Sequence, residues 1–473
     1  MVKDLFSIFA PQIIIVLAIF CQTIMSLIKS PRLVFKFKNI NIQTSNSISI
    51  LALILSLISV FFLWGGDASF NTSIVISPFI KICSALIFIS GIATLFMDAN
   101  LLSENRQSCY KFHILLLTGI LGAVCAICAN DFLTLFVALE VLSFSLYFLI
   151  SFLKGYLSKE ASFKYLLTNS VSMAFFLFGV SYLLGLSSSM NFDDILSYLT
   201  SPTNIVLYSL SALFIFVGLA MKLAIFPFAN WIIDVYAGTE TSVLAFLSSI
   251  PKIVVICVLF RLLSGVLSYS LELTVCILIL ATFTAFWANI YAVKENNIKK
   301  ILACSSAANA SYMLIVLPLV SAVGDAAVLF YLISYTIMNL GVWAYLNMLE
   351  AKLKSWALDD FKRVNNLFKS GLYIVLLFGL AGLPVSIGFV AKVYLLYALI
   401  SAGLLYLPVL LILLVLFVIS LYYYIRVARA ILNGVIDTNS RGSSLVLYLT
   451  TGLTLILGLL PWRIISECVK IFS

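Results

Sequence analysis

Apolar runs of roughly twenty residues recur along the whole chain, and they constrain its fold more than any other feature. A membrane-spanning helix needs about 20 apolar residues, and backbone polar groups inside lipid must be satisfied within helices or closed barrels. Fourteen such runs stand between polar or Gly/Pro boundaries, at residues 7–28, 47–65, 77–97, 112–129, 132–152, 162–185, 206–226, 241–262, 272–293, 301–319, 325–349, 371–395, 405–425 and 443–462. The sequence therefore predicts an all-α polytopic membrane protein with about fourteen transmembrane helices.

The composition argues against a soluble enzyme. Hydrophobic residues make up 63% of the chain and charged residues 10%, whereas soluble domains are about half apolar and about a quarter charged. No G-x-G-x-x-G or Walker-type loop is present. The only CxxC spacing, Cys125 to Cys128, lies in an apolar run, and His113 is the only histidine. Metal and iron–sulfur ligation therefore lack ligands, and we expect no cofactor or metal site in this chain.

Most basic residues lie in the connectors at one end of the predicted bundle. Of 28 lysines and arginines, twenty fall at one end of the predicted bundle and five at the other, while Lys222, Lys252 and Lys392 fall within apolar runs. Lysine and arginine accumulate in cytoplasmic loops, so the first connector is predicted to be cytoplasmic and both termini to lie outside. The first run is predicted to be a retained span and not a cleaved signal peptide. The net charge of +9 is thus a topology signal, and no nucleic-acid partner is expected.

Four charged residues are predicted to lie deep in the membrane: Glu140, Lys222, Lys252 and Lys392. Each costs about 2.5–3.5 kcal/mol on insertion scales, so its presence is a functional hypothesis. Glu140 would be stabilised by a nearby cation, with Lys222 as its natural partner. Lysines held among apolar helices could load and release protons. The alternative is that these side chains reach an interface or form structural ion pairs.

Prolines mark where two of the helices are expected to break. Lys222 precedes Pro227 by five residues, and Lys392 follows Pro384 by eight. Interrupted helices at matching places in two halves are typical of transport sites in inverted-repeat folds. The two lysines are five spans apart, which predicts two inverted five-helix repeats. The resulting division is an N-terminal part at 1–111, a first repeat at 112–270, a second repeat at 271–435 and a last helix at 436–473.

The chain resembles a known family in several segments between residues 112 and 396. These segments are NDFLTLFVALEVLSFSLYFL around Glu140, EASFKYLLTNS from Glu160, GLAMKLAIFPFANWIIDVYAGTETSVLAFLSSIPK from Gly218, NNIKKILACSSAANASYMLI from Asn296, FYLISYTIMNLGVWAY from Phe330 and LAGLPVSIGFVAKVYLL from Leu380. Together they resemble the antiporter-like membrane subunits of proton-translocating NADH:quinone oxidoreductase, respiratory complex I. The DVYxG element at 234–238 and the pair Pro251 and Lys252 are most similar to the subunit N branch, the counterpart of mitochondrial subunit 2.

The resemblance implies a function as one proton channel of a larger translocase. Glu140 would pair with Lys222 and tune its proton affinity, Lys252 would relay protons along a polar axis, and Lys392 would pass them outward. NADH, FMN, iron–sulfur clusters and most of the quinone chamber would belong to partner subunits. The expected surroundings are other complex I membrane subunits and the lipid bilayer of a bacterial inner membrane or an equivalent energy-transducing membrane.

The sequence departs from the family pattern at three positions. Ala229 and Asn309 stand where members often have histidine, and Ile233 stands where proline is common. Histidine is the side chain best suited to relay protons near neutral pH. A proton path here must therefore use lysines, water and hydroxyls, such as Ser305, Ser306 and Tyr312.

Two further groups of charges lie near the predicted cytoplasmic ends of the helices. Glu160 and Lys164 have the i,i+4 spacing of a surface ion pair. Asp234 and Glu240 lie in a connector without basic residues, which fits a solvated loop, a proton-collecting surface or a docking surface. Two other functions also remain open: a cation/proton (Na+/H+) antiporter subunit, and a non-conducting membrane scaffold.

Overall fold

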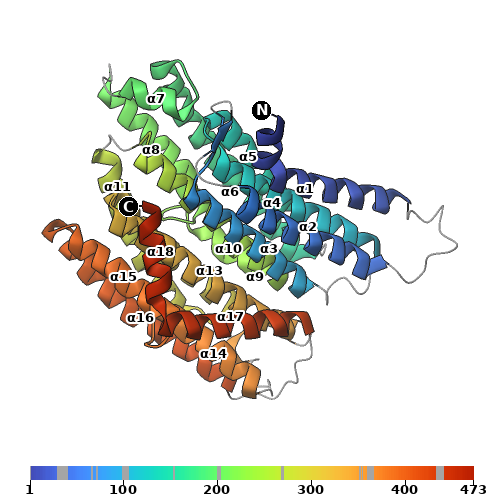
Figure 1. The fold of residues 1–473 in the computed structure, drawn as a ribbon. Helices are drawn as coiled ribbons and strands as arrows, with labels where there is room; N and C mark the ends of the chain where they lie inside the picture. The colour runs from blue at the N-terminus through green and yellow to red at the C-terminus, as the bar shows by residue number, and fades with distance from the viewer. Residues whose placement is uncertain are drawn as a thin grey trace.

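The computed structural model describes residues 2–28, 41–64, 68–70, 73–98, 106–152, 155–199, 204–267, 271–350, 353, 355–359, 367–432 and 441–472. This part of the chain forms one bundle of long helices (Figure 1). Its first half contains α1 (Val2–Ile28), α2 (Asn41–Leu63), α3 (Pro78–Asp98), α4 (Arg106–Cys128), α5 (Phe132–Ile150), α6 (Tyr156–Ser187), α7 (Phe192–Leu199), α8 (Ile205–Lys222), α9 (Asn230–Gly238) and α10 (Thr241–Ser264). Its second half contains α11 (Leu271–Lys294), α12 (Ile298–Val316), α13 (Ala322–Glu350), α14 (Leu367–Ala381), α15 (Ile387–Ser401), α16 (Leu407–Leu432), α17 (Arg441–Leu459) and α18 (Pro461–Phe472), with 3₁₀ turns at Leu317–Leu319 and Leu404–Tyr406.

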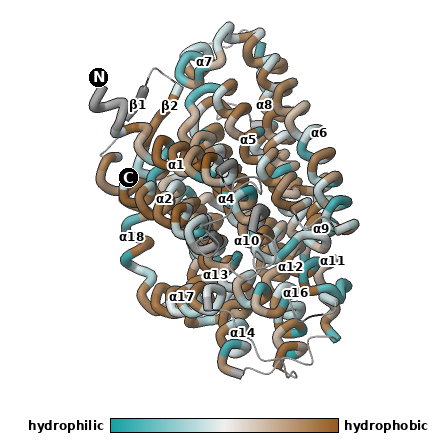
Figure 2. The backbone as a smooth tube through the Cα atoms, turned by 90° about the vertical axis from the view of Figure 1, so that its right-hand side faces the viewer, coloured by the Kyte–Doolittle hydropathy of each residue, from teal (hydrophilic) through white to brown (hydrophobic). Residues whose placement is uncertain are grey.

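The predicted polytopic helical class is confirmed. Thirteen helices in the described ranges are long and apolar enough to cross a membrane, and each coincides with one predicted run. The remaining run, 371–395, contains two shorter apolar helices, α14 and α15, with the interruption expected near Pro384. Hydrophobic residues predominate along the helices in Figure 2. Helices α10, α12 and α13 are almost wholly buried, whereas α1, α2, α6 and α16 expose many apolar side chains, as a lipid-facing surface requires.

The first interruption separates α8 from α9. The chain leaves the helix after Lys222 and passes through Ala224, whose φ is 58°, and a cis peptide bond between Phe226 and Pro227. Proline cannot donate a backbone hydrogen bond, so a helix cannot continue normally through it. The Phe226 amide is satisfied by Thr284 Oγ1 at 2.9 Å. The helix therefore ends at the lysine, as the position of the proline predicts.

The second interruption separates α14 from α15. Gly382 has a φ of 85° and Val385 a φ of 76°, which are conformations incompatible with a continuous right-handed helix. The Ser386 hydroxyl accepts a hydrogen bond from the Phe389 amide at 3.3 Å and caps the start of α15. Capping by serine satisfies one of the free amides at a helix start. The two interruptions lie five spans apart, and the division into two inverted repeats remains a prediction.

Three small elements lie outside the predicted spans. A β-ribbon pairs β1 (Ala68–Phe70) with β2 (Ile74–Ile76) in antiparallel register, and α7 follows α6 as a short helix. The last helix, α18, is amphipathic, and the Phe472 ring lies 5.6 Å from Phe79 and 5.3 Å from Phe260. Because Phe79 begins α3 and Phe260 lies near the end of α10, the chain finishes at the same end of the bundle at which α1 begins. Which side of the membrane this is stays a prediction.

Candidate functional site

All four predicted charges lie inside the bundle, on four different helices. Glu140 is in α5, Lys222 is the last residue of α8, Lys252 is in the middle of α10 and Lys392 is in α15. Lys252 is 3% exposed and Lys392 is 5% exposed. Neither ammonium group reaches an interface, and among the described residues neither lies within 4.0 Å of a carboxylate. Snorkelling and structural ion pairs therefore do not explain these two lysines.

Glu140 and Lys222 belong to one polar cluster without touching as an ion pair. The Lys222 ammonium donates hydrogen bonds to Ser143 Oγ at 2.9 Å and to Asn169 Oδ1. Ser143 lies one turn after Glu140 on α5, and the Glu140 carboxyl interacts electrostatically with both Lys222 and Asn169. One carboxyl oxygen, Oε1, is buried without a hydrogen-bond partner. The expected direct pair is thus an indirect one, because neutral polar groups from α5 and α6 hold the ammonium.

A small cavity of about 10 Å³ adjoins Lys222. Its walls include Thr168, Asn169 and Trp231. A volume of this size holds about one water molecule, and polar walls favour its occupation. The Trp231 ring packs 5.3 Å from the Tyr165 ring and donates its Nε1 hydrogen to Met221 O, so aromatic side chains close the site on the α9 side.

Lys252 lies at the centre of the bundle. Its ammonium donates to the carbonyl and hydroxyl oxygens of Ser306, and it lies 3.4 Å from Tyr335 OH. Ser306 Oγ also contacts Tyr335 OH at 2.9 Å and Tyr236 OH at 3.1 Å. Hydroxyls both donate and accept hydrogen bonds. The lysine therefore touches groups that can take a proton and pass another one onward.

Lys392 lies in α15 next to the interruption between α14 and α15. Its ammonium donates to the Ala381 carbonyl at 2.8 Å, at the end of α14. It lies 4.5 Å from the centre of the Phe417 ring and 5.9 Å from that of Tyr312. The carbonyl is free to accept because α14 ends there, so the broken helix creates the site for the cation.

Hydrogen bonds and ring contacts lead from the surroundings of Lys252 toward Lys392. Ser305, next to Ser306 on α12, bonds to Tyr424 OH, and the rings of Tyr423 and Tyr424 lie 4.5 Å apart. Tyr423 OH donates a hydrogen bond to Asn289 Oδ1 at 3.4 Å, and Asn289 Nδ2 donates one to Tyr312 OH at 2.8 Å. The Tyr312 ring then faces Lys392. All three hydroxyls named from the sequence lie on or beside this path.

The two positions that lack the family's histidine differ in their surroundings. Asn309 Nδ2 donates to Ser305 O at 2.7 Å, and its Oδ1 accepts from Tyr331 OH at 2.7 Å. Asn309 thus keeps two polar contacts, although an amide does not titrate as an imidazole does. Ala229 is buried at the start of α9 and offers no polar side chain.

Several polar members of the site were not predicted from the sequence. They are Asn169, Asn289, Tyr335 and Tyr424. A usable signal exists for one helix: Tyr331, Tyr335, Asn339 and Trp343 recur every four residues in α13, which places them on one face. The other three come from separate helices, so no spacing in the sequence connects them to the lysines.

Further charged residues lie at the ends of the helices, away from the four buried charges. Lys164 Nζ lies 2.8 Å from Glu160 and 2.7 Å from Asp234, so the predicted i,i+4 pair is confirmed and extended by a third residue. The description of Glu240 as part of a solvated loop is wrong. Glu240 is 8% exposed because α9 ends at Gly238 and α10 begins at Thr241, which draws the short connector into the bundle.

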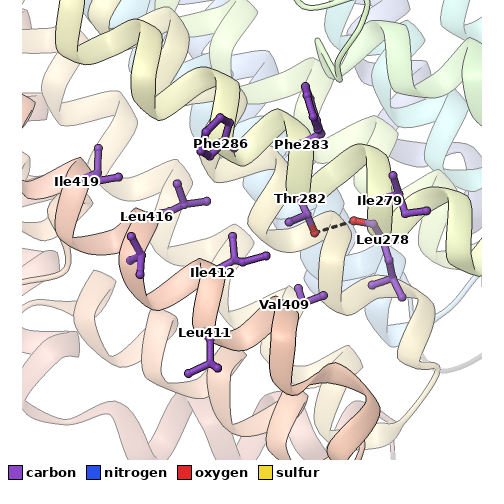
Figure 3. A pocket seen from close by; sticks show the side chains of 11 residues that line it. Leu278, Ile279, Thr282, Phe283, Phe286, Val409, Leu411, Ile412, Leu416 and Ile419 are labelled. Atoms are coloured by element: carbon purple, nitrogen blue, oxygen red, sulfur yellow. Dashed lines mark hydrogen bonds between the residues drawn. The ribbon is translucent and has the colours of Figure 1, made fainter.

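One pocket in the described part of the chain is almost entirely apolar. It is a groove of about 740 Å³ between α11 and α16, shown in Figure 3. Its single polar side chain, Thr282, already donates to Leu278 O at 2.7 Å. The groove therefore has no group that could move a proton. Among the described residues, no group of three or more His, Cys, Asp and Glu side chains could hold a metal ion.

Buried cations at interrupted helices, joined by hydroxyls and amides, define an antiporter-like membrane subunit. Residues 129–420 match the family of transmembrane NADH:quinone oxidoreductase/Mrp antiporter proteins. A relative from Solibacter usitatus (strain Ellin6076), NADH-quinone oxidoreductase subunit N 1, is 31% identical over 389 residues, covering 80% of this chain and 79% of the relative.

Solved structures agree with this relationship at the level of the fold. A chain of respiratory complex I from Thermus thermophilus with bound aureothin superposes with a TM-score of 0.80 at 24% identity, covering 96% of this chain and 98% of that one. A chain of the Mrp complex from Dietzia sp. DQ12-45-1b gives a TM-score of 0.83 at 16% identity, covering 100% and 97%. The chain belongs to the NADH:quinone oxidoreductase/Mrp antiporter family, on the branch of complex I subunit N.

Proposed function

We propose that this chain is the proton-translocating subunit N of a respiratory NADH:quinone oxidoreductase, with Glu140, Lys222, Lys252 and Lys392 as its proton-carrying axis. The observation that carries the proposal is the burial of Lys252 against Ser306 and Tyr335, away from carboxylates. An uncompensated buried cation is costly, so a purely structural role would not retain it. Its neighbours are groups that exchange protons.

The arrangement of side chains suggests how a proton moves. An ammonium group at Lys252 gives a proton to Ser306 or Tyr335, and the accepting hydroxyl releases its own proton to the next oxygen, so charge is conserved at each step. At Lys222, the ammonium group interacts electrostatically with the Glu140 carboxylate. Any change that weakens this interaction favours release of the proton. Water molecules would carry the proton between Lys222 and Ser306.

The energy for net transport must come from partner subunits. Moving one charge against 100 mV requires about 2.3 kcal/mol. NADH oxidation by FMN and iron–sulfur clusters in other subunits, and reduction of quinone, would supply it. The proposed location is a bacterial inner membrane or an equivalent membrane, with both termini on the outer side and no nucleic-acid partner. The basic residues of the connectors support this orientation.

The test uses the assembled complex in inverted membrane vesicles. The variants are Lys222→Ala, Glu140→Ala and Lys252→Met, with Lys470→Ala on the exposed face of α18 as the control. We expect native gels to show assembled complexes, and NADH-driven proton pumping to fall at least about tenfold in the three axis variants and to stay unchanged in the control. Normal pumping in all three assembled axis variants would refute the role.

A second candidate is a subunit of a cation/proton (Na+/H+) antiporter, which the superposition with the Mrp complex favours. Sodium-dependent proton exchange in vesicles that lack NADH-oxidising subunits would support it. A native gel with mass spectrometry separates the two functions, since only the first requires NADH-oxidising partners to co-migrate. A non-conducting scaffold predicts instead that all four charged sites tolerate neutral substitution.

A further inference from the structure

A second group of buried charges lies at the opposite end of the bundle from the chain's last residue. We call Asp98, Glu240, Lys299, Glu350 and His113 the end cluster. Its members come from the end of α3, the residue before α10, the first turn of α12, the end of α13 and the start of α4. Asp98 and His113 are each 1% exposed and Lys299 is 2% exposed. The axis described above includes none of them.

Lys299 holds one side of the end cluster together. Its ammonium lies 3.1 Å from Glu350 Oε1 and donates to Thr239 O at 2.6 Å. Glu350 also accepts from the Thr241 amide at 3.1 Å and from the Thr241 hydroxyl. Glu350 is thereby fixed at the start of α10. A single lysine balances one carboxylate here.

The other side of the cluster consists of Asp98 and the chain's only histidine. His113 Nε2 lies 3.3 Å from Asp98 Oδ2, and Ser45 Oγ contacts His113 Nδ1 at 2.7 Å. Both side chains are enclosed by α2, α3 and α4. The negative charge of Asp98 reaches Glu240 across this region.

Glu240 occupies the position between these two pairs. Its Oε1 is buried and has no hydrogen-bond partner, and it does not cap α10. Its charged neighbours are Glu350 from α13, Asp98 from α3 and Lys299 from α12. Burial, with Glu350 and Asp98 as further causes, raises the pKa of Glu240 to about 8.

The balance of charges indicates what this cluster can do. Two carboxyls, Glu350 and Glu240, interact with Lys299, and the third, Asp98, contacts His113 and acts on Glu240 through its charge. Like charges in a buried site cannot all ionise together. The end cluster therefore retains a proton near neutral pH, and the unpartnered Glu240 oxygen is the atom best placed to carry it.

A seam of polar side chains leads from the end cluster to Lys252. On α10, Thr241 and Ser248 face α13: Thr241 Oγ1 contacts Asn347 Oδ1 at 2.8 Å, and Ser248 Oγ accepts from Asn339 Nδ2 at 2.7 Å. Ser248 and Lys252 are four residues apart on α10 and share one helix face. The rise from Glu240 to Lys252 is about 18 Å at 1.5 Å per residue.

We propose that Asp98, Glu240, Glu350 and Lys299 form a proton-loading site, and that the seam between α10 and α13 delivers the loaded proton to Lys252. This rests on the proposed function of Lys252. A proton from bulk water binds a Glu240 carboxylate oxygen, later leaves that oxygen for a hydroxyl or water of the seam, and no other bond changes. By the predicted orientation, the site faces the cytoplasm.

The experiment measures NADH-driven proton pumping against pH in vesicles containing the complete complex. The wild-type rate should fall as the pH rises through about 8, where Glu240 loses its proton. Glu240→Gln should lower the rate at least about tenfold and remove this alkaline decline. Glu350→Gln removes a neighbouring negative charge, so it should move the decline to lower pH. Glu467→Gln, an exposed carboxyl on α18, is the matched control and should keep the wild-type profile.

The outcomes separate this proposal from the proposed function. Native gels first establish that the variants assemble; if Glu240→Gln does not, the shift in Glu350→Gln decides. Wild-type profiles in the assembled variants, with Lys252→Met inactive, overturn the loading site alone. Normal pumping in assembled Lys252→Met overturns delivery to this lysine, and normal pumping in Lys222→Ala and Glu140→Ala as well overturns the proposed function. A reduced rate in Glu240→Gln with an unchanged pH profile indicates a structural role and also overturns the loading site.

Discussion

Gly382 offers a direct test of how the broken helix positions Lys392. The residue has a φ of 85°, and its amide donates to Phe378 O and Gly379 O, both at 3.0 Å, at the end of α14. A Cβ atom added to it would lie 2.7 Å from Lys392 Cδ and 3.4 Å from Lys392 Nζ. The substitution Gly382→Ala therefore strains the backbone and displaces the lysine from the Ala381 carbonyl.

The expected cost follows from these two effects. A left-handed conformation costs a residue with a Cβ about 1–2 kcal/mol. Losing a hydrogen bond from a charged donor costs about 1.5–3 kcal/mol. Because the lysine stem is flexible, part of the close contact relaxes, and we expect Gly382→Ala to lower the stability of the α14–α15 region by about 2–4 kcal/mol.

The matched control is Gly371→Ala on α14, where an added Cβ has no neighbouring atom within 4 Å. Alanine in a helix interior is about 0.5–1 kcal/mol more favourable than glycine. The assay compares thermal inactivation and proton pumping of the two assembled complexes. Gly382→Ala should inactivate at lower temperature and pump less, whereas Gly371→Ala should equal or exceed the wild type. If both variants behave alike, the interruption does not position Lys392.

Three further predictions concern the polar network and its pH dependence. Asn169→Leu removes an acceptor of Lys222 and should reduce pumping in an assembled complex, which a native gel and a vesicle assay check together. Asn309→His can keep the contacts to Ser305 and Tyr331, so pumping should be retained; loss of assembly would contradict this. Burial raises the pKa of Glu240 from 4.5 to about 8, so the folded chain binds this proton more tightly than the unfolded chain between these values. Its contribution to stability is therefore present at low pH and lost as the pH rises through about 8. The thermal midpoint of Glu240→Gln should lack this decline.

Much of the architecture could be predicted from the sequence because lipid imposes a length on every span. The thirteen long helices coincide with predicted runs, and Pro227 and Pro384 indicate where helices cannot continue. The exact ends were less predictable: Pro384 predicts an interruption within the run at 371–395, but the end of α14 at Ala381 and the start of α15 at Ile387 depend on the positive φ values of Gly382 and Val385, which packing sets. The helix α18 was not predicted as a separate element, because its twelve residues are fewer than a membrane span needs.

The site was only partly predictable. The four charges could be found because ionised groups are rare in apolar runs, but their partners could not. Lys222 is held by Ser143 and Asn169 instead of by a direct bond to Glu140. Such contacts join helices whose rotation and depth are set by packing, which the order of residues in one helix does not encode.

The sequence by itself determined that this chain crosses a membrane many times, and that it carries a carboxyl and three lysines among apolar residues. The tertiary structure alone decided which neutral groups surround each charge, and that Glu240 is buried beside Glu350 and not in a solvated loop. The physical reason is the difference in the distance over which these effects act. Hydropathy acts on each segment separately, whereas hydrogen bonds and charge interactions act over a few ångströms between segments far apart in the chain.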